Sequence, residues 1–228
     1  IWPIIAVPTT SGTGSEVGRA GVVTNTAEEV KKVIFHPKML PAIVISDPEL
    51  TVGLPPHITA GTGMDAFVHN LEAYCAPTYH PMSEGIAVEG MRLVKEYLPR
   101  AYAKGDDIEA RGHMMSAAAM GAVAFQKGLG GIHSLSHPAG VLYHTHHGLT
   151  NAVYLPYVMA FNRPAIEGKI DRLAAWLGIE GGFDGFMKYI LDLRSDLGIA
   201  HTSKEIGIDD AQTERMAAMA VVDPTAGG

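Results

Sequence analysis

The sequence predicts a strand-rich segment of α/β type at residues 1–56, followed by a mostly helical domain at residues 57–228. Two observations carry this prediction. Short apolar runs rich in β-branched residues, separated by turn residues, are concentrated in the first 56 positions. From about Thr59 onward, apolar residues recur at helical spacing over long stretches, and Pro55 and Pro56 separate these two patterns.

Four runs in the first segment predict strands. The stronger two are IIAVP at 4–8 and PAIVIS at 41–46, and the weaker two are AGVVTN at 20–25 and KKVIFHP at 31–37. In the second part, Phe67, Leu71 and Tyr74 fall on one face of a helix, and MMSAAAMGAVAF at 114–125 predicts a small-residue helix suited to close packing. Further helices are expected near 167–177, 183–197 and 209–221.

Composition limits the classes of function. The chain is 47% hydrophobic and 18% charged, which is typical of a compact globular protein. Its net charge of -7 and the absence of any Lys/Arg-rich block argue against a nucleic-acid partner or an anionic membrane surface. The apolar runs are too short to span a bilayer. We therefore expect a soluble protein with a small-molecule partner.

Cysteine usage suggests a compartment. Cys75 is the one cysteine, so no internal disulfide can form, and no signal peptide precedes the first strand. A reducing cytoplasm is the expectation. Ile1 lies within an apparent strand and Gly228 follows no evident helix end, so both termini are expected to be truncated.

The first candidate site is AVPTTSGTGSE at 6–16, a Gly- and hydroxyl-rich turn directly after a strand. Backbone N–H groups and Thr/Ser hydroxyls in such a turn can line a concavity and donate hydrogen bonds to phosphate or ribose oxygens. The spacing matches neither the dinucleotide fingerprint nor the P-loop. A polar turn without any ligand explains the same residues equally well.

The second candidate is GTGMDAFVHNLEAY at 61–74. Asp65 and His69 are four residues apart on a predicted helix, so they project from one face and can hold one ion between them. The alternative is an acid favoured by the helix dipole and a histidine packed in the core.

The third candidate is GGIHSLSHPAGVLYHTHHG at 130–148, which contains five of the 11 histidines. His133 and His137 are four apart, and His144, His146 and His147 follow after a short bend. Two histidines at helical spacing and another some ten residues later can supply imidazole ligands from two elements. Spacing alone does not choose which of them bind.

One carboxylate and several imidazoles, without a thiolate, suit a divalent Fe, Zn, Co or Ni ion. The motifs PTTSGTGSE, GTGMDAFVHNLEAY, GLGGIHSLSHPAG and HHGLTNAVYLPYV occur in this order across nearly the whole chain. Together they resemble the iron-containing, group III alcohol dehydrogenases. The resemblance implies the remnant of a Rossmann-like nucleotide-binding domain at 1–56 and an all-helical metal-binding domain of the dehydroquinate synthase type at 57–228, truncated at its end.

The resemblance also implies roles for individual residues. The metal ligands would be Asp65, His69, His133 and His147. His137 matches a position near the substrate that assists proton movement. The resemblance assigns no role to His144 and His146.

On the nucleotide side, Thr9, Thr10 and Thr13 match cofactor contacts, and Lys31 matches a lysine that approaches the nicotinamide nucleotide. The family's glycine-rich pyrophosphate loop would lie ahead of Ile1, outside this sequence. The resemblance therefore implies NAD or NADP as the cofactor without choosing between them.

The implied activity is reversible hydride transfer between a small alcohol or hydroxy acid and NAD(P), assisted by Fe²⁺ or Zn²⁺, in a homodimer. Alternatives are a maleylacetate reductase-like enzyme of the same fold, a glycerol dehydrogenase-type zinc enzyme, and a non-catalytic metal-binding helical module. Lys127, just ahead of the histidine cluster, is either a solvated surface lysine or a partner for a substrate carboxylate.

Overall fold

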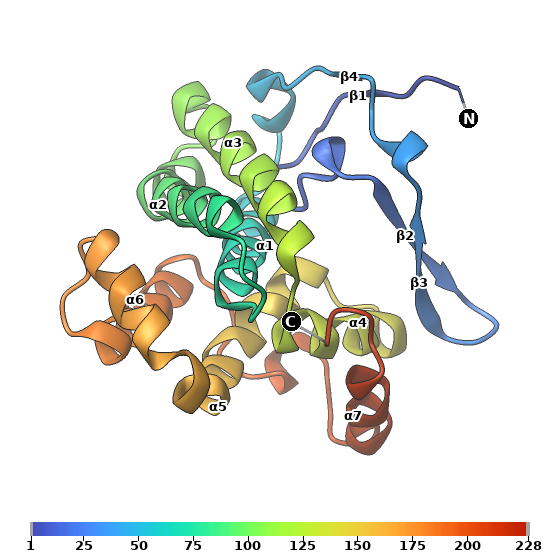
Figure 1. The fold of residues 1–228 in the computed structure, drawn as a ribbon, viewed down its shortest axis with the longest axis vertical. Helices are drawn as coiled ribbons and strands as arrows, with labels where there is room; N and C mark the ends of the chain where they lie inside the picture. The colour runs from blue at the N-terminus through green and yellow to red at the C-terminus, as the bar shows by residue number, and fades with distance from the viewer. Residues whose placement is uncertain (1, 227–228) are drawn as a thin grey trace.

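Helix α1 (Pro56–Cys75) runs through the middle of the molecule (Figure 1), and three of the later helices pack directly against it. A helix whose apolar residues occupy all sides must be covered on all sides. All but one of the residues from Thr59 to Tyr74 are buried, with Phe67 and Leu71 among the largest fully buried side chains. The computed structural model that shows this arrangement describes residues 2–226.

The remaining helices confirm a mostly helical second part. They are α2 (Pro81–Ala103), α3 (Ile108–Ala124), α4 (Gly131–Tyr143), α5 (His147–Trp176), α6 (Gly182–Asp196) and α7 (Thr213–Val221), and the short 3-10 helices are η1 (Ser15–Val17), η2 (Pro37–Met39), η3 (Pro48–Thr51), η4 (Phe125–Lys127) and η5 (Lys204–Ile206). Helices α6 and α7 lie close to where the sequence predicts them. Among the helices of residues 2–226, none combines the length and the apolar character that crossing a bilayer requires.

The prediction of a separate helix near 167–177 is wrong in extent. These residues form the C-terminal part of α5, which is 30 residues long and continues through Pro156 and Pro164. Proline usually ends or kinks a helix because it lacks a backbone donor. Here α5 packs against α1, α4 and α6 with Pro156 on its buried face, and these tertiary contacts offset the donors that the prolines lack.

All four apolar runs of the first segment form strands. Strand β1 (Ile5–Ala6) pairs in parallel with β4 (Ile43–Val44), and β2 (Ala20–Asn25) pairs antiparallel with β3 (Val30–Phe35). Both sheets have two strands, and they lie to one side of the helices in Figure 1. The structure thus shows the predicted change from strands to helices, while a Rossmann-like sheet is not visible within residues 2–226.

The polar turn after β1 lies against the helical part. Gly14 has a φ of +65°, and a Cβ at this position would stand 2.2 Å from the carbonyl oxygen of Ala118 in α3. Glycine alone allows both the left-handed backbone and this close approach. The turn is therefore held against α3, and a Cβ on Gly12 of the same turn would stand 3.4 Å from Oδ2 of Asp65 in α1.

Helices α1 and α5 come into close backbone contact near the histidine cluster. A Cβ on Gly148, the second residue of α5, would lie 2.1 Å from the carbonyl oxygen of Gly61 in α1 and 3.1 Å from Cβ of Asp65. The contact is between backbones, so no side chain can move aside to relieve it. This approach brings the start of α5 beside Asp65.

We expect Gly148→Ala in the full-length protein to lower the free energy of unfolding by about 2 kcal/mol, because overpacking outweighs the gain in helix propensity. Gly168→Ala, in the same helix, is the matched control. No atom lies within 4 Å of a Cβ there, so the control should gain about 1 kcal/mol. Chemical denaturation measures both. Equal stabilisation by the two substitutions would contradict the close contact.

Candidate metal centre

Three side chains from three helices converge at one point. Asp65 of α1, His133 of α4 and His147 of α5 each offer a ligand atom, and these atoms lie within 4.8 Å of one another. Oδ1 of Asp65 is 3.7 Å from Nε2 of His133 and 3.5 Å from Nε2 of His147. Tertiary packing therefore joins the second and third sequence motifs at a single buried site.

His69 completes this group from the same face of α1 as Asp65. Its Nδ1 lies 3.8 Å from Oδ2 of Asp65, and its ring stacks on that of His133 with a centroid distance of 4.4 Å. Nδ1 of His69 is buried and has no hydrogen-bond partner among residues 2–226. A buried, unpaired imidazole nitrogen directed at a carboxylate is costly unless a cation shares it.

Asn151 links the three converging side chains, a role that the motif analysis missed. Its Nδ2 donates to Oδ1 of Asp65 at 2.8 Å and lies 3.3 Å from Nε2 of both His133 and His147. Asn151 is one turn after His147 on α5, so the spacing of four residues in HHGLTN was the available signal.

Glu72 fixes the orientation of His133 from behind. Its Oε2 lies 2.6 Å from Nδ1 of His133, and its Oε1 accepts from the backbone N–H of Ile132 at 2.6 Å. The carboxylate thus anchors the first turn of α4 and holds the proton on Nδ1, which leaves Nε2 directed toward Asp65. Carboxylate partners of this kind orient metal-binding histidines in general. The sequence motifs did not identify Glu72 as a site residue either, although it lies on the same helical face as Asp65 and His69.

The charges of the site follow from burial and proximity. Burial lowers the pKa of His69 to about 4 and that of His147 to about 3, although the negative charge of Asp65 acts to raise both pKa values. Burial also disfavours a charged His133, but Glu72 and Asp65 outweigh it and raise the pKa of His133 to about 9. Burial opposes the charge of Asp65 too, yet the three histidines hold its pKa well below the usual range.

This donor set fits a divalent metal ion. It offers a carboxylate and three imidazoles in a buried position, two of the imidazoles are neutral, and Nδ1 of His69 has no partner within residues 2–226. Imidazole and carboxylate ligands without a thiolate suit Fe²⁺ or Zn²⁺. Binding would displace the proton on Nε2 of His133 and replace the hydrogen bond that the amide of Asn151 donates to Asp65.

His137 lies next to this group and is held by a different carboxylate. Its ring stacks on that of His147 at a centroid distance of 5.5 Å, and its Nδ1 lies 2.9 Å from Oδ2 of Asp223. Burial raises the pKa of Asp223, but hydrogen bonds from His137 and Thr225 outweigh it, so the net shift is downward. No sequence pattern connects Asp223 with His137, which lies 86 residues away.

The predicted nucleotide residues approach the metal centre to different degrees. Oγ1 of Thr13 lies 3.5 Å from Oδ2 of Asp65, whereas Thr9 and Thr10 are exposed in the turn after β1. Lys31 of β3 lines a cavity of about 100 Å³ together with His137 and Asp223. Burial lowers the pKa of Lys31, opposed by the charges of Asp223 and Asp65.

The two unassigned histidines belong to the turn between α4 and α5. His144 is exposed and ends α4 in the left-handed conformation, with a φ of 54°. His146 caps α5, because its Nδ1 accepts from the backbone N–H of Leu149 at 3.3 Å. The dense histidine run therefore divides into residues of the site and residues of the turn.

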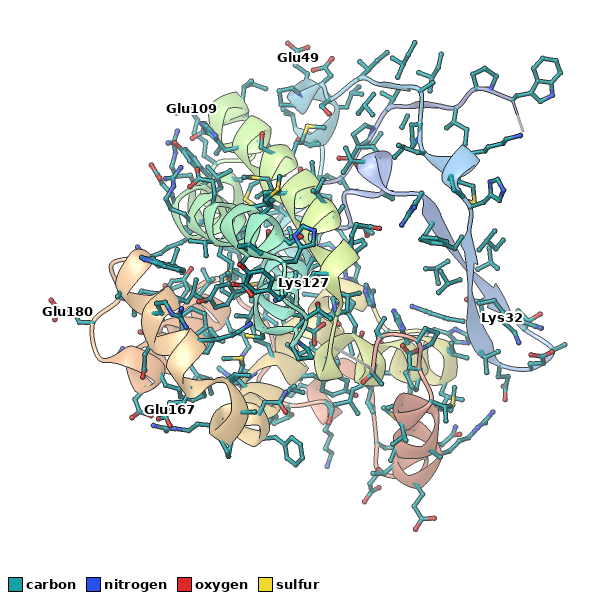
Figure 2. All side chains as sticks on the ribbon, viewed as in Figure 1. Lys32, Glu49, Glu109, Lys127, Glu167 and Glu180 are labelled. Carbon is teal, nitrogen blue, oxygen red and sulfur yellow. The ribbon has the colours of Figure 1, made fainter. Side chains whose placement is uncertain are left out.

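The position of Lys127 contradicts the prediction that this lysine pairs with a substrate carboxylate. It lies in the interior (Figure 2), where its fully buried Nζ donates to the carbonyl oxygens of Ala73, Tyr74 and Ala76 at 3.0, 3.1 and 2.6 Å and to Oε1 of Glu84 at 2.9 Å. These carbonyls end α1, where a cation is favoured. The alternative of a solvated surface lysine is wrong too, since the side chain satisfies orphan carbonyls.

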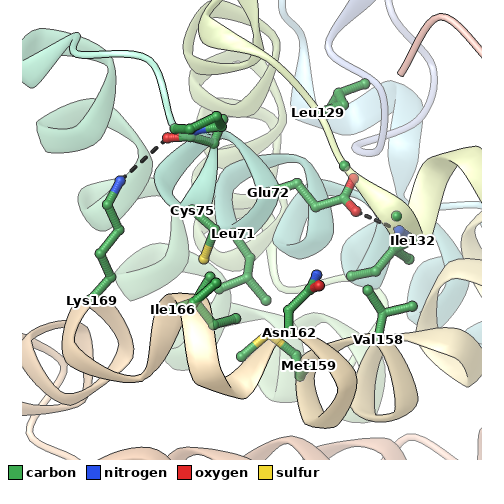
Figure 3. A pocket seen from close by; sticks show the side chains of 15 residues that line it. Leu71, Glu72, Cys75, Leu129, Ile132, Val158, Met159, Asn162, Ile166 and Lys169 are labelled. Atoms are coloured by element: carbon green, nitrogen blue, oxygen red, sulfur yellow. Dashed lines mark hydrogen bonds between the residues drawn. The ribbon is translucent and has the colours of Figure 1, made fainter. Parts of the chain in front are cut away.

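A cavity of about 280 Å³ lies behind the metal centre, between α1, the start of α4 and α5 (Figure 3). Leu71, Val158, Met159 and Ile166 give it a largely apolar wall. The one residue it shares with the network around the metal centre is Glu72. None of the site residues predicted from the sequence lines it.

Comparison with known proteins matches this architecture. The family model described as Fe-containing alcohol dehydrogenase family, C-terminal, matches residues 59–227. The model described as iron-containing alcohol dehydrogenase matches residues 1–48. The chain belongs to the iron-containing alcohol dehydrogenase family. The resemblance read from the motifs is thereby confirmed.

Individual members of the iron-containing alcohol dehydrogenases resemble the chain closely. The 4-hydroxybutyrate dehydrogenase of Cupriavidus necator is 41% identical over 97% of this chain and 60% of its own length. A crystal structure of 1,3-propanediol oxidoreductase matches with a TM-score of 0.93 at 38% identity, over 98% of this chain and 61% of that one. Sulfoacetaldehyde reductase from Bifidobacterium kashiwanohense in complex with NAD+ matches with a TM-score of 0.90 at 32% identity, over 98% and 59%.

The chain thus spans about 60% of the length of these relatives. Experiments on activity and metal binding therefore require the full-length protein.

Glu72→Gln in the full-length protein should weaken metal binding by about 10- to 100-fold, as loss of such a carboxylate partner does. A glutamine has one acceptor oxygen for two donors, so its amide NH2 must face either Ile132 N–H or His133 Nδ1. Competition with a chelator measures the affinity, with Glu89→Gln on the surface of α2 as the control. Unchanged affinity in Glu72→Gln would refute the positioning of His133.

Lys127→Met should destabilise the full-length protein by about 2 kcal/mol, because it leaves the carbonyl oxygen of Ala73 without its side-chain donor, while Lys169 still donates to those of Tyr74 and Ala76. For the substrate preference under test, it should not alter the ratio of the kcat/KM measured with 4-hydroxybutyrate to that measured with n-butanol. Thermal unfolding and steady-state kinetics test both parts, with the exposed Lys188→Met as the control. A selective loss on 4-hydroxybutyrate would restore the substrate role of Lys127.

Proposed function

We propose that the full-length protein is a metal-dependent, NAD(P)-linked alcohol dehydrogenase that also reduces aldehydes. The observation that carries the proposal is the convergence of Asp65, His133 and His147, with the unpaired Nδ1 of buried His69 beside them. Family membership supports it, since relatives named as hydroxybutyrate dehydrogenase and propanediol oxidoreductase share the fold at 41% and 38% identity.

Asp65, His69, His133 and His147 would hold Fe²⁺ or Zn²⁺. A divalent ion bound by these four residues supplies a Lewis acid for the oxygen of an alcohol or carbonyl group. The protein's own contribution is to keep the ligands in place. Glu72 holds His133, and Ser136, whose Oγ lies 3.4 Å from Nδ1 of His147, does the same for that ligand.

His137 is proposed to carry the proton that the alcohol loses. Its ring lies beside that of His147, and it is separate from the converging ligand atoms. With Nδ1 donating to Asp223, the remaining nitrogen Nε2 can accept a proton and return it. This arrangement serves both directions of a reversible reaction.

Residues 1–56 are proposed to be part of the nucleotide-binding domain. Thr9, Thr10 and Thr13 belong to the turn that lies over the metal centre, and the contact of Thr13 with Asp65 brings this turn to the reacting region. Lys31 would approach the nucleotide from β3. The NAD+ complex of sulfoacetaldehyde reductase, a relative of 32% identity, supports a nicotinamide cofactor. Residues 1–56 do not determine the preference between NAD and NADP.

The substrate is proposed to be a small alcohol, aldehyde or hydroxy acid, in keeping with the names of the relatives. A homodimer in a reducing cytoplasm, acting on no nucleic acid, is part of the same proposal. The acidic net charge of -7 and the lone Cys75 support it.

Two substitutions at neighbouring histidines test this function. His147→Ala in the full-length protein should lose bound metal and turnover together, because a ligand is removed. His137→Ala should retain the metal and slow NAD(P)-linked alcohol oxidation by about 100-fold, as expected for loss of a proton carrier. Elemental analysis and steady-state assays measure both. Full metal occupancy in His147→Ala would refute the ligand set, and a wild-type protein that binds metal but oxidises no alcohol would support a non-catalytic module.

A further inference from the structure

A carboxylate near the end of the described chain reaches the candidate proton carrier. Oδ2 of Asp223 lies 2.9 Å from Nδ1 of His137, and their side chains are only 9% and 12% exposed. A hydrogen bond between a carboxylate and a neutral imidazole requires the proton on Nδ1. Asp223 therefore selects one tautomer of His137, and Nε2 is left without a proton.

The carboxylate of Asp223 is itself held in a fixed orientation. Its Oδ1 accepts from the backbone N–H of Thr225 at 2.9 Å and from Oγ1 of Thr225 at 2.5 Å. Both donors bind the same oxygen, so Oδ2 alone remains for His137. A backbone N–H can only donate, which fixes the rotation of the group more strongly than a hydroxyl does.

Tertiary packing brings the two residues together. Helices α4 and α7 lie side by side in Figure 1, and Ala139 of α4 packs with Met216 of α7 and Ile208. Asp223 follows directly after α7, and it lines a cavity of about 100 Å³ with His137 and Lys31. The ring of His137 is also stacked on that of His147 with an interplanar angle of 21°. Its position and its plane are thus fixed from two sides.

We propose that Asp223 is the positioning residue of His137, which holds the imidazole with its proton on Nδ1 so that Nε2 can accept the proton of the alcohol. The proposal rests on the proposed function, because it assigns Asp223 a part in that reaction. The same logic orients histidine bases in other enzymes, where a buried carboxylate sets the tautomer without taking the proton itself. A purely structural reading makes the contact a clamp between α4 and the segment after α7, and it predicts a loss of stability in the variant without a selective loss of kcat.

Asp223→Asn separates these readings. The amide oxygen must stay on the N–H of Thr225, so the amide NH2 faces Nδ1 of His137 and forces the proton onto Nε2. In the full-length, zinc-loaded protein, ¹⁵N NMR of the histidine rings should show a protonated Nδ1 in the wild type and a protonated Nε2 in Asp223→Asn. We expect kcat to fall by about 100-fold or more, with KM within about twofold and metal content unchanged.

Asp209→Asn is the matched control, because Oδ1 of Asp209 accepts from the hydroxyl of Tyr143 at 2.7 Å and also connects α4 with the region of α7. It should keep the tautomer and the kcat. Asp223→Glu retains a carboxylate and should preserve a protonated Nδ1, which covers the case in which Asp223→Asn fails to fold. In the background of His137→Ala, Asp223→Asn should cause no further loss of kcat.

An unchanged tautomer in Asp223→Asn, or a loss of kcat that adds fully to that of His137→Ala, would overturn the inference. If the wild-type protein oxidises no alcohol, the proposed function fails, and the NMR comparison still decides whether Asp223 sets the tautomer of His137.

Discussion

Asp65 is 4% exposed in the middle of a helix that is covered on nearly all sides, and the packing of the molecule around α1 depends on how this charge is compensated. An ionised carboxylate in such a position is unfavourable unless it is paired. Asn151 donates to it, and three histidines from three helices surround it. The compensation of one buried charge thereby dictates where α4 and α5 must lie relative to α1.

The other polar residues of α1 impose similar constraints. Asn70 donates to the carbonyl oxygens of Ala66 and Ala117 and so ties α1 to α3, whereas Glu72 ties it to the first turn of α4. At the end of α1, Lys127 and Lys169 share the carbonyls of Tyr74 and Ala76 with Glu84 beside them. Asn70, Glu72 and the carbonyls at the end of α1 have partners on different neighbours, so a sliding helix would leave buried groups unpaired.

Small residues make these approaches possible. The contact of Gly148 with Gly61 lets the start of α5, and therefore His147, reach Asp65. The turn after β1 reaches the same region through the left-handed Gly14 against α3. The turn after β1 and the side chains around Asp65 consequently lie close together, with Oγ1 of Thr13 3.5 Å from Oδ2 of Asp65.

The sequence by itself determined the change from strands to helices near Pro55 and Pro56, and it determined that Asp65 and His69 share a helical face, because both depend only on local periodicity. Motif resemblance then identified the family. Local patterns were insufficient for α5, which continues through Pro156 and Pro164 while packed against α1, α4 and α6. They were also insufficient for Lys127, since its sequence neighbours say nothing of the carbonyls at the end of α1.

Only the tertiary structure decided which histidines converge, and that Asn151, Glu72 and Asp223 support them. Asn151 and Glu72 carry local signals of helical spacing, although the spacing does not show what their side chains contact. Asp223 carries none, because 86 residues separate it from His137 and the packing of α7 on α4 alone brings them within 2.9 Å. Helical periodicity fixes which side chains share a face, while the partner across the interface depends on contacts between residues far apart in the chain.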